Sequence, residues 1–167
     1  YLNFMGNEWG HPEWIDFPRE GNGWSFAHAR RLWSLAENGY LRYELLGNFD
    51  KAMIALIRKY DVLEGGMPRC LRQHEDDQIL AFEKKGCVFV FNFHPTRSQT
   101  GLFVPVPEKG DYQVILSTDD KTFGGYQNID KSVVYHTWAH DPQMGDGFVI
   151  YLPARTAVVL RRVEKKD

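Results

Sequence analysis

The strongest constraint on the fold of this chain is a change of pattern at Gly65-Gly66-Met67-Pro68. Beyond it, short runs of β-branched and aromatic residues alternate with turn residues at intervals of about ten residues. Such a series is typical of an all-β sandwich. We expect eight strands, with the strongly apolar run Cys87–Phe93 as the central one. The other strands are Arg69–His74, Gln78–Glu83, Gly101–Val106, Tyr112–Ser117, Ser132–Thr137, Gly147–Leu152 and Thr156–Arg162.

The residues before this point follow a different pattern, with apolar side chains at helical spacing. The expected helices are Trp24–Glu37, Leu41–Gly47 and Asp50–Tyr60. Asp50 is the expected N-cap of the last of them. Gly6–Gly23 lacks apolar periodicity and is expected to be a loop. Tyr1–Met5 is an apolar run that predicts a strand buried on both faces.

A buried strand followed by helices is the ending of a (β/α)8 barrel. We therefore expect two parts in a chain that is mainly β. Residues 1–66 form the last strand, the following loop and the helices of a truncated (β/α)8 barrel. Residues 67–167 form an antiparallel β-sandwich of eight strands.

The composition excludes two classes of partner. The formal net charge is -2, whereas nucleic-acid-binding proteins usually carry a clear basic excess. No apolar stretch reaches the roughly 18 residues of a membrane span. We therefore expect neither nucleic acid nor a membrane as a partner.

The two cysteines, Cys70 and Cys87, lack the CxxC spacing of metal and redox sites. Both fall in expected strands, where a buried, reduced thiol is the usual state of a free cysteine. Reduced thiols suit a cytosolic compartment. A disulfide between adjacent strands is the alternative.

The sequence indicates no metal or cofactor site. No group of His, Cys, Asp and Glu has metal-ligand spacing, and no phosphate-binding glycine loop is present. His94, at the end of the central strand, is expected to be structural. Arg30-Arg31 are expected to pair with acids of the loop or with the sandwich. Gly124-Gly125-Tyr126 predicts a turn with an exposed aromatic side chain.

A resemblance to a known family runs along the chain. The segment Asn3–Arg19, with the run His11-Pro12-Glu13-Trp14, resembles the region around the eighth barrel strand of eukaryotic-type glycogen and starch branching enzymes, in the α-amylase superfamily. Family members usually carry Phe where this chain has Trp9, and the stretch between Val134 and Phe148 is shorter than in plant members. Further similar motifs follow in order: Ala29-Arg30-Arg31, Leu41-Arg42-Tyr43, Asn48-Phe49-Asp50, Phe89–Pro95, Leu116–Asp119, Phe123–Gly125 and Pro153–Thr156.

The resemblance implies the C-terminal part of a 1,4-α-glucan branching enzyme, which forms α-1,6 branches in glycogen or starch by retaining glycosyl transfer. The family's catalytic Asp, Glu and Asp would lie upstream of Tyr1, so the chain alone has no catalytic residue and is expected to be inactive. The reaction needs no metal or organic cofactor. The implied partners are an α-glucan and the rest of the catalytic barrel, in the cytoplasm or, in a plant, the plastid.

The resemblance also places the loop at the C-terminal mouth of the barrel, where active sites are built. There Asn7, Glu8, His11 and Trp14 would line sugar subsites, since amides and carboxylates bind hydroxyl groups and an indole stacks on a sugar ring. Tyr126 is a further candidate for a sugar contact. The alternative for these residues is structural. In that case Glu8 and His11 pair with neighbouring loop residues, Trp14 fills the core and Tyr126 packs against its turn.

Two other functions stay open. A stand-alone α-glucan-binding sandwich would be favoured by an exposed pair of aromatic side chains spaced to bridge adjacent glucose units. The second open function is that of a debranching enzyme or an amylase. The run His11-Pro12-Glu13-Trp14 argues against it.

Overall fold

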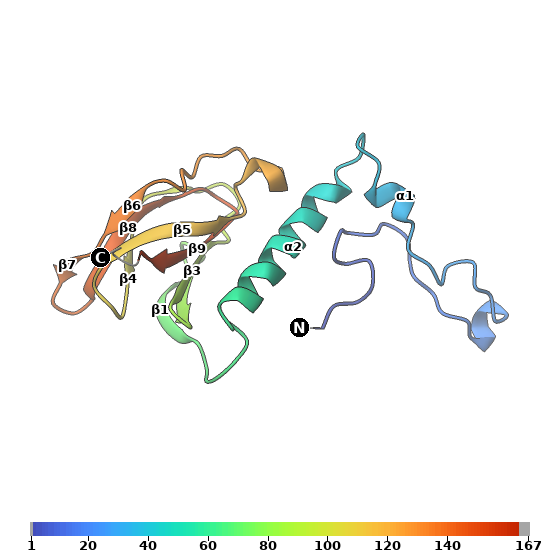
Figure 1. The fold of residues 1–167 in the computed structure, drawn as a ribbon, viewed down its shortest axis with the longest axis horizontal. Coiled ribbons are helices and arrows are strands. Elements are labelled where there is room, and N and C mark those ends of the chain that lie inside the picture. The colour runs from blue at the N-terminus through green and yellow to red at the C-terminus, as the bar shows by residue number, and fades with distance from the viewer. Residues whose placement is uncertain (1, 164–167) are drawn as a thin grey trace. The chain divides into compact units, whose positions relative to one another are not determined.

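The structure is a computed structural model that describes residues 2–163 (Figure 1). Contacts between residues divide it into two compact units, Tyr1–Ile54 and Ala55–Asp167. The division lies within helix α2 (Tyr43–Lys59), and each unit is described here by itself. The domain boundary expected after Gly66 stays a prediction.

The first unit contains little regular structure. Its elements are η1 (Glu20–Asn22), α1 (Trp33–Ala36) and the start of α2. The strand expected at Tyr1–Met5 is wrong for the described residues, since residues 2–4 form no strand and lie exposed. An apolar run becomes a strand only where another strand satisfies its backbone groups. Tyr1 itself lies outside the described residues. No helix within residues 2–163 is long and apolar enough to cross a membrane.

The prediction of a helix over Trp24–Glu37 is also wrong, because only the four residues of α1 are α-helical in this range. In a helix the amide of Leu32 would bond to the carbonyl of His28, four residues earlier. Here the Leu32 amide donates instead to His11 Nε2 at 3.0 Å. The His28 carbonyl accepts from the Asp16 amide at 3.2 Å. Both groups are thus bound to the preceding loop, and no helix runs through this turn.

The two helices expected over Leu41–Gly47 and Asp50–Tyr60 form one continuous helix, α2. Asp50 therefore lies inside the helix and is not its N-cap. Gly47 lies inside this helix, where a glycine lowers helix stability by only about 1 kcal/mol relative to alanine. The burial of Leu56, with Ile57 packed beside it, offsets a penalty of this size.

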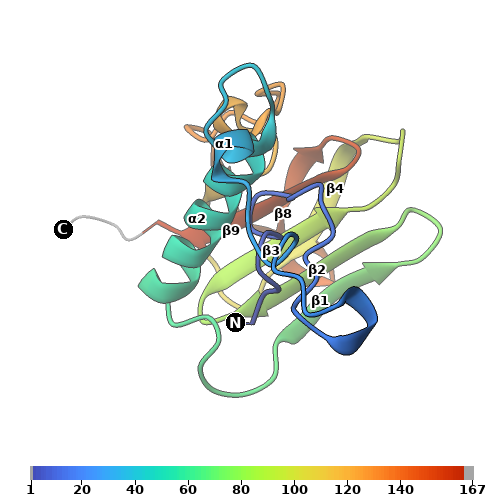
Figure 2. The ribbon, with the colours of Figure 1, turned by 90° about the vertical axis from the view of Figure 1, so that its right-hand side faces the viewer.

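The second unit is a sandwich of two antiparallel sheets (Figure 1, Figure 2). The larger sheet has the strand order β1-β2-β3-β9-β5-β6, and the smaller sheet has the order β4-β8-β7. The strands are β1 (Arg69–His74), β2 (Ile79–Lys84), β3 (Cys87–Asn92), β4 (Gln99–Pro105), β5 (Asp111–Ser117), β6 (Val134–His136), β7 (Trp138–Asp141), β8 (Gly145–Leu152) and β9 (Thr156–Arg162). A short 3-10 helix, η2 (Lys121–Phe123), follows β5. The all-β sandwich is confirmed, and β3 lies inside the larger sheet as expected.

The described residues form nine strands, one more than the sequence pattern predicts. The additional strand is β7, which pairs with β8 in the smaller sheet, whereas β6 pairs with β5 in the larger one. Only Thr137 separates β6 from β7, and its amide donates to the Gly110 carbonyl at 3.1 Å. The chain changes sheets here without a turn sequence, so the pattern gives no sign of a second strand.

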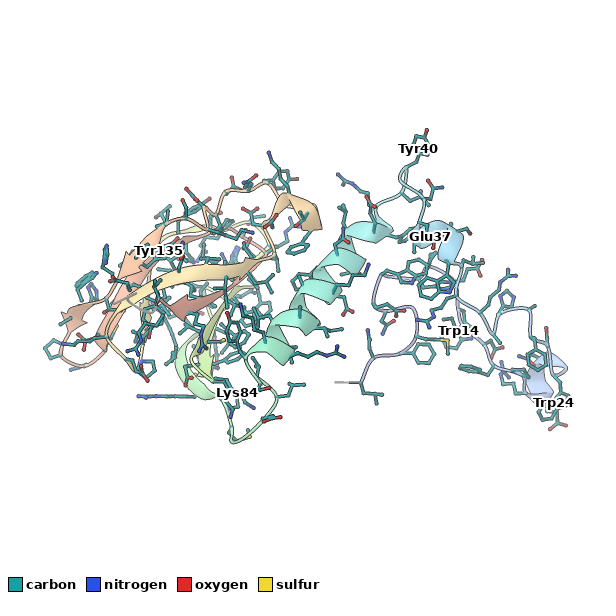
Figure 3. The ribbon with its side chains drawn as sticks, in the orientation of Figure 1. Trp14, Trp24, Glu37, Tyr40, Lys84 and Tyr135 are labelled. Carbon is teal, nitrogen blue, oxygen red and sulfur yellow. The ribbon has the colours of Figure 1, made fainter. Side chains whose placement is uncertain are left out.

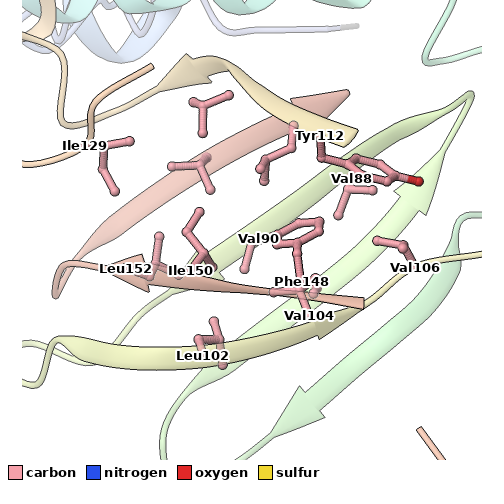
Figure 4. Packing of buried hydrophobic residues seen from close by; sticks show 14 of the residues in the cluster. Val88, Val90, Leu102, Val104, Val106, Tyr112, Ile129, Phe148, Ile150 and Leu152 are labelled. Carbon is pink, nitrogen blue, oxygen red and sulfur yellow. The ribbon is translucent and has the colours of Figure 1, made fainter. Parts of the chain in front are cut away.

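Alternating side chains fill the space between the sheets. On β8, Phe148, Ile150 and Leu152 are fully buried, whereas Val149 and Tyr151 remain partly exposed. Inward side chains from both sheets meet in one cluster. Those labelled in Figure 4 are Val88, Val90, Leu102, Val104, Val106, Tyr112, Ile129, Phe148, Ile150 and Leu152.

A second apolar cluster lies on the opposite face of the larger sheet. Leu56 and Val62, near the end of α2, pack with Cys87 of β3 and Val159 of β9. Cys87 alternates along β3 with the core residue Val88, so it points away from the smaller sheet. The C-terminal part of α2 therefore covers this face of the sandwich.

Both cysteines carry free thiols. Cys87 is buried, as expected, and burial raises the pKa of its thiol. Cys70 is exposed, which corrects the expectation that both are buried. β1 is an edge strand, and a bulge between Cys70 and Arg72 interrupts its alternation. Because β2 lies between β1 and β3, the adjacent-strand disulfide is not formed.

Phe148→Ala is expected to lower the free energy of unfolding by about 3–5 kcal/mol, because it empties a fully buried site between the two sheets. The matched control is Phe93→Ala, which truncates an exposed ring and is expected to cost less than about 1 kcal/mol. Urea unfolding followed by far-ultraviolet circular dichroism measures both. Similar losses in the two variants would contradict the position assigned to the core.

Candidate functional site

Glu8 ties the first loop to the segment before α1. The Gly6 amide donates to Glu8 Oε2 at 2.6 Å, and the Arg31 guanidinium donates to Glu8 Oε1. This confirms the expected pairing of Arg31 with a loop acid. The same guanidinium lies 4.6 Å from the centre of the Trp33 ring. Gly6 has a φ of +93°, and a Cβ there would lie 2.6 Å from His11 Cβ, so the turn requires glycine.

The contacts of Glu8 fix its charge. Partial burial, the largest single influence, raises the pKa of the Glu8 carboxyl. Hydrogen bonds from its own backbone amide, from Arg31 and from the Gly6 amide together outweigh burial, and the pKa is lowered. Glu8 is therefore a carboxylate near neutral pH, bound to a guanidinium and to backbone amides.

His11 makes the second connection between the loop and this segment. Its Nε2 accepts a hydrogen bond from the Leu32 amide, and its Nδ1 lies 3.0 Å from the Glu13 carbonyl oxygen. An amide can only donate and a carbonyl can only accept, so the ring carries its proton on Nδ1 and is neutral. Both ring nitrogens are used inside the loop.

Trp9 forms the small core of the first unit. Its ring is buried and meets His11 and Tyr43 edge-on, at 5.0 and 5.5 Å between ring centres, with Trp33 at 6.4 Å. Its indole Nε1 has no hydrogen-bond partner among the described residues. Sequence reasoning treated Trp9 only as a departure from Phe, although a large apolar residue between Gly6 and Gly10 is itself a sign of a buried anchor.

Trp14 is 79% exposed, so the alternative in which it fills the core is wrong (Figure 3). The loop around it is held by Asp16, whose carboxylate accepts from Arg19 Nε at 3.0 Å and from Asn22 Nδ2 at 3.0 Å. The bonds from Arg19, then from Asn22, lower the pKa of Asp16, with a smaller contribution from the Trp14 side chain. The indole face of Trp14 is thus open to solvent on an ordered loop.

The loop residues fall into two groups. Glu8 and His11 both bind the short segment Arg31–Leu32, as the structural alternative expects. Asn7 and Trp14 are exposed. The binding of sugar by these four residues stays a prediction, and the geometry allows the two exposed residues to contact a ligand directly.

Tyr126 lies in the second unit, in the turn after η2, and is 86% exposed. The exposed aromatic expected at this turn is confirmed, but its contact with sugar stays a prediction. Gly125, just before it, packs against the backbone of Asp119. A Cβ at this glycine would lie 2.1 Å from the carbonyl carbon of Asp119, so no other residue fits without a shift of the backbone.

A buried carboxylate, which sequence reasoning missed, holds this turn in place. Asp119 Oδ1 accepts from the Tyr126 amide at 3.0 Å, and Oδ2 accepts from the Ile129 amide at 3.1 Å and from the Asn128 amide. The Asp119 carbonyl also accepts from the Gln127 amide at 2.8 Å. The sequence contains one sign of this arrangement, an acidic residue two positions after a strand and before a glycine-rich turn.

His94 is structural, as expected. Its Nδ1 accepts from the amides of Thr96 and Arg97, at 3.2 and 2.8 Å. Within residues 2–163, no group of three or more His, Cys, Asp or Glu side chains is arranged to hold a metal ion.

Comparison with known proteins gives two findings. Residues 71–163 match the family described as alpha amylase, C-terminal all-beta domain. The chain is also similar to proteins named 1,4-alpha-glucan-branching enzyme. That of Eremothecium gossypii is 45% identical over 164 residues, covering 97% of this chain and 23% of the relative. Those of Dictyostelium discoideum and Rhizophagus irregularis are 43% and 42% identical, covering 98% and 96% of this chain and 24% of each relative. The chain thus spans about a quarter of the length of these relatives and matches their C-terminal portion.

The amide signal of Gly6 is expected to report the ionisation of Glu8. Because the pKa of Glu8 is lowered, the signal should titrate with a midpoint below the ordinary glutamate value of about 4.3. The stabilisation from this carboxylate is present above the ordinary pKa and is lost as pH falls through the lowered one. Two-dimensional NMR spectra recorded between about pH 2 and pH 7 measure the midpoint of this titration. Glu8→Gln should abolish the titration, and a midpoint above the ordinary value would contradict the contacts described.

Asp119→Asn is expected to lower the free energy of unfolding by about 1–3 kcal/mol. An asparagine amide nitrogen cannot accept the backbone N–H groups that the two carboxylate oxygens now bind. The matched control is Asp130→Asn, an exposed aspartate that accepts from the Ser132 amide and hydroxyl, with an expected cost below about 1 kcal/mol. Urea unfolding compares the variants, and an equal cost would count against Asp119 as the support of the turn.

Proposed function

The chain belongs to the alpha amylase C-terminal all-beta domain family, and from this membership we propose that it forms the C-terminal part of a 1,4-α-glucan-branching enzyme. The parent enzyme cleaves an α-1,4 linkage, holds the donor chain as a covalent glycosyl-enzyme and transfers it to a 6-hydroxyl group. This is a retaining, double-displacement reaction.

One observation carries the proposal. The family model covers only residues 71–163, but the branching-enzyme relatives match 96% or more of the chain, including the loop of the first unit. An all-β domain alone occurs with many chemistries, and fold does not fix function. The similarity of the loop, at 42–45% identity over the matched length, supports branching specifically.

Two carboxyl groups of the loop, those of Glu8 and Asp16, support a catalytic centre elsewhere in the parent enzyme. A retaining glycosyl transfer needs a general acid that still holds its proton at the working pH, and hence a raised pKa. The pKa values of Glu8 and Asp16 are both lowered. Each carboxylate is also bound to an arginine, Arg31 or Arg19. Neither group is suited to donate a proton to a leaving sugar.

In the proposed enzyme the loop supplies sugar contacts. Glu8 and His11 hold its shape through Arg31–Leu32, while Asn7 offers an amide to sugar hydroxyls and Trp14 offers a flat face for stacking. Tyr126 offers a second face on the sandwich. The proposed partners are an α-glucan and the preceding catalytic barrel, in glycogen synthesis in the cytoplasm or starch synthesis in a plastid.

A stand-alone glucan-binding module is the competing function. It accounts for the exposed Tyr126 but gives the first unit no role. A branching enzyme accounts for both units, and we therefore prefer it.

A chimera tests the proposal. Residues 1–167 replace the matching C-terminal portion of the Eremothecium gossypii enzyme, and branching of amylose is followed by the loss of iodine absorbance. The chimera is expected to branch amylose. The chain alone and the truncated enzyme are the controls and should leave the iodine spectrum unchanged, because neither combines a catalytic centre with its C-terminal part.

Two outcomes would contradict the proposal. One is branching by the chain alone, in proportion to its concentration, which would require a catalytic centre inside residues 1–167. The other is a chimera that is soluble and folded by circular dichroism but inactive on amylose.

A further inference from the structure

The outward face of the smaller sheet is rich in exposed apolar side chains. Because β8 turns Phe148 and Ile150 into the core, Val149 and Tyr151 point the other way, and Tyr151 is 41% exposed. β4 alternates in the same manner, so Phe103 points outward beside Val149. The face is therefore continuous across β4 and β8.

A glycine keeps this face flat. The ring of Phe103 lies over Gly147 of β8, where a Cβ would come within 2.5 Å of Phe103 Cζ and 2.4 Å of the Val104 carbonyl oxygen. Any larger residue at position 147 would lift the ring away from the sheet. Phe103 is consequently buried at the base of the face, and its neighbours rise around it.

Trp138 forms one end of the face. It pairs with Gly147 across the sheet and is 46% exposed. Its ring meets Phe103 at 6.0 Å and His140 at 4.8 Å, both edge-on, and His140 stacks on Phe103 at 4.6 Å. The indole is thus held by two other rings, so little conformational entropy is lost when a ligand contacts it.

The chemistry of the face favours a neutral ligand with flat apolar surfaces. The described part of this face consists of Phe103, Trp138, His140, Gly147, Val149 and Tyr151, and none of these six residues carries a carboxylate, ammonium or guanidinium group. From strand lengths and spacings the face measures on the order of 300–400 Å². A standard protein interface buries about 800 Å² on each partner, so a second copy of the chain or another protein fits poorly. A sugar polymer, neutral and narrow, fits well.

The spacing of the two exposed rings sets the length of the ligand. Tyr151 lies four residues along β8 from Gly147, the partner of Trp138, a distance of about 13 Å. One sugar ring cannot contact both ends, whereas a chain of several linked glucose units can. We propose that the outward face of the smaller sheet binds an α-1,4-linked glucan, stacked on Trp138 at one end and Tyr151 at the other. The choice of glucan rests on the proposed function.

Titration of the 167-residue chain with maltoheptaose tests this site by NMR. Each of the five tryptophans gives its own indole N–H signal, and Trp138→Phe assigns that of Trp138. The Trp138 signal should move with ligand, with a dissociation constant of about a millimolar. Tyr151→Ala should weaken the affinity read at Trp138 about three- to tenfold, whereas Tyr151→Phe and the control Tyr40→Ala, which truncates an exposed ring of the first unit, should leave it unchanged. Maltose should bind more weakly than maltoheptaose.

The remaining outcomes separate this inference from the proposed function. A response at Trp14 without one at Trp138 would overturn the inference and leave glucan binding by the loop intact. No response at any indole would also overturn it, and the branching assay of the chimera then decides the function independently. A dimer that forms with concentration and is lost in Trp138→Phe and Tyr151→Ala would assign the face to a second copy of the chain.

Discussion

The alternation of side chains along β8 determines the second unit on both sides of the smaller sheet. Its inward residues, with Phe148 among them, fill the core, and its outward residues, Val149 and Tyr151, form the outer face. A slip of one residue in the register of β8 would exchange these two sets. Gly147 opposes such a slip, because the ring of Phe103 leaves no room for a side chain at its position. Stability and outer surface therefore depend on one register.

In the irregular segments, polar side chains hold the backbone in place by hydrogen bonds. Glu8 satisfies the Gly6 amide in the first loop and His11 satisfies the Leu32 amide before α1, and Asp119 satisfies amides of the turn that carries Tyr126. Each takes a backbone group that would otherwise pair within a helix or with water. A sequence shows that such residues are present but not which amides they reach, because those amides lie up to 21 residues away along the chain. For this reason the sequence indicated Glu8, His11 and Tyr126 as candidate site residues but did not indicate the role of Asp119.

The strands of the sandwich were predictable, because short runs of β-branched and aromatic residues are separated by turn residues. β7 was missed since only Thr137 separates it from β6. The helix expected over Trp24–Glu37 failed for another reason. Its apolar spacing is genuine, but the amide of Leu32 and the carbonyl of His28 are bound to the loop. Local periodicity carries no information on that competition.

The contrast between the two thiols has a practical consequence. Cys87 is enclosed between β3 and α2, and the raised pKa of its thiol keeps the reactive thiolate scarce. Cys70 stands exposed on the edge strand β1. A maleimide dye or spin label added to the folded protein therefore attaches at Cys70 alone. The native sequence thus offers a single-site probe of the sandwich edge without any cysteine being removed or introduced.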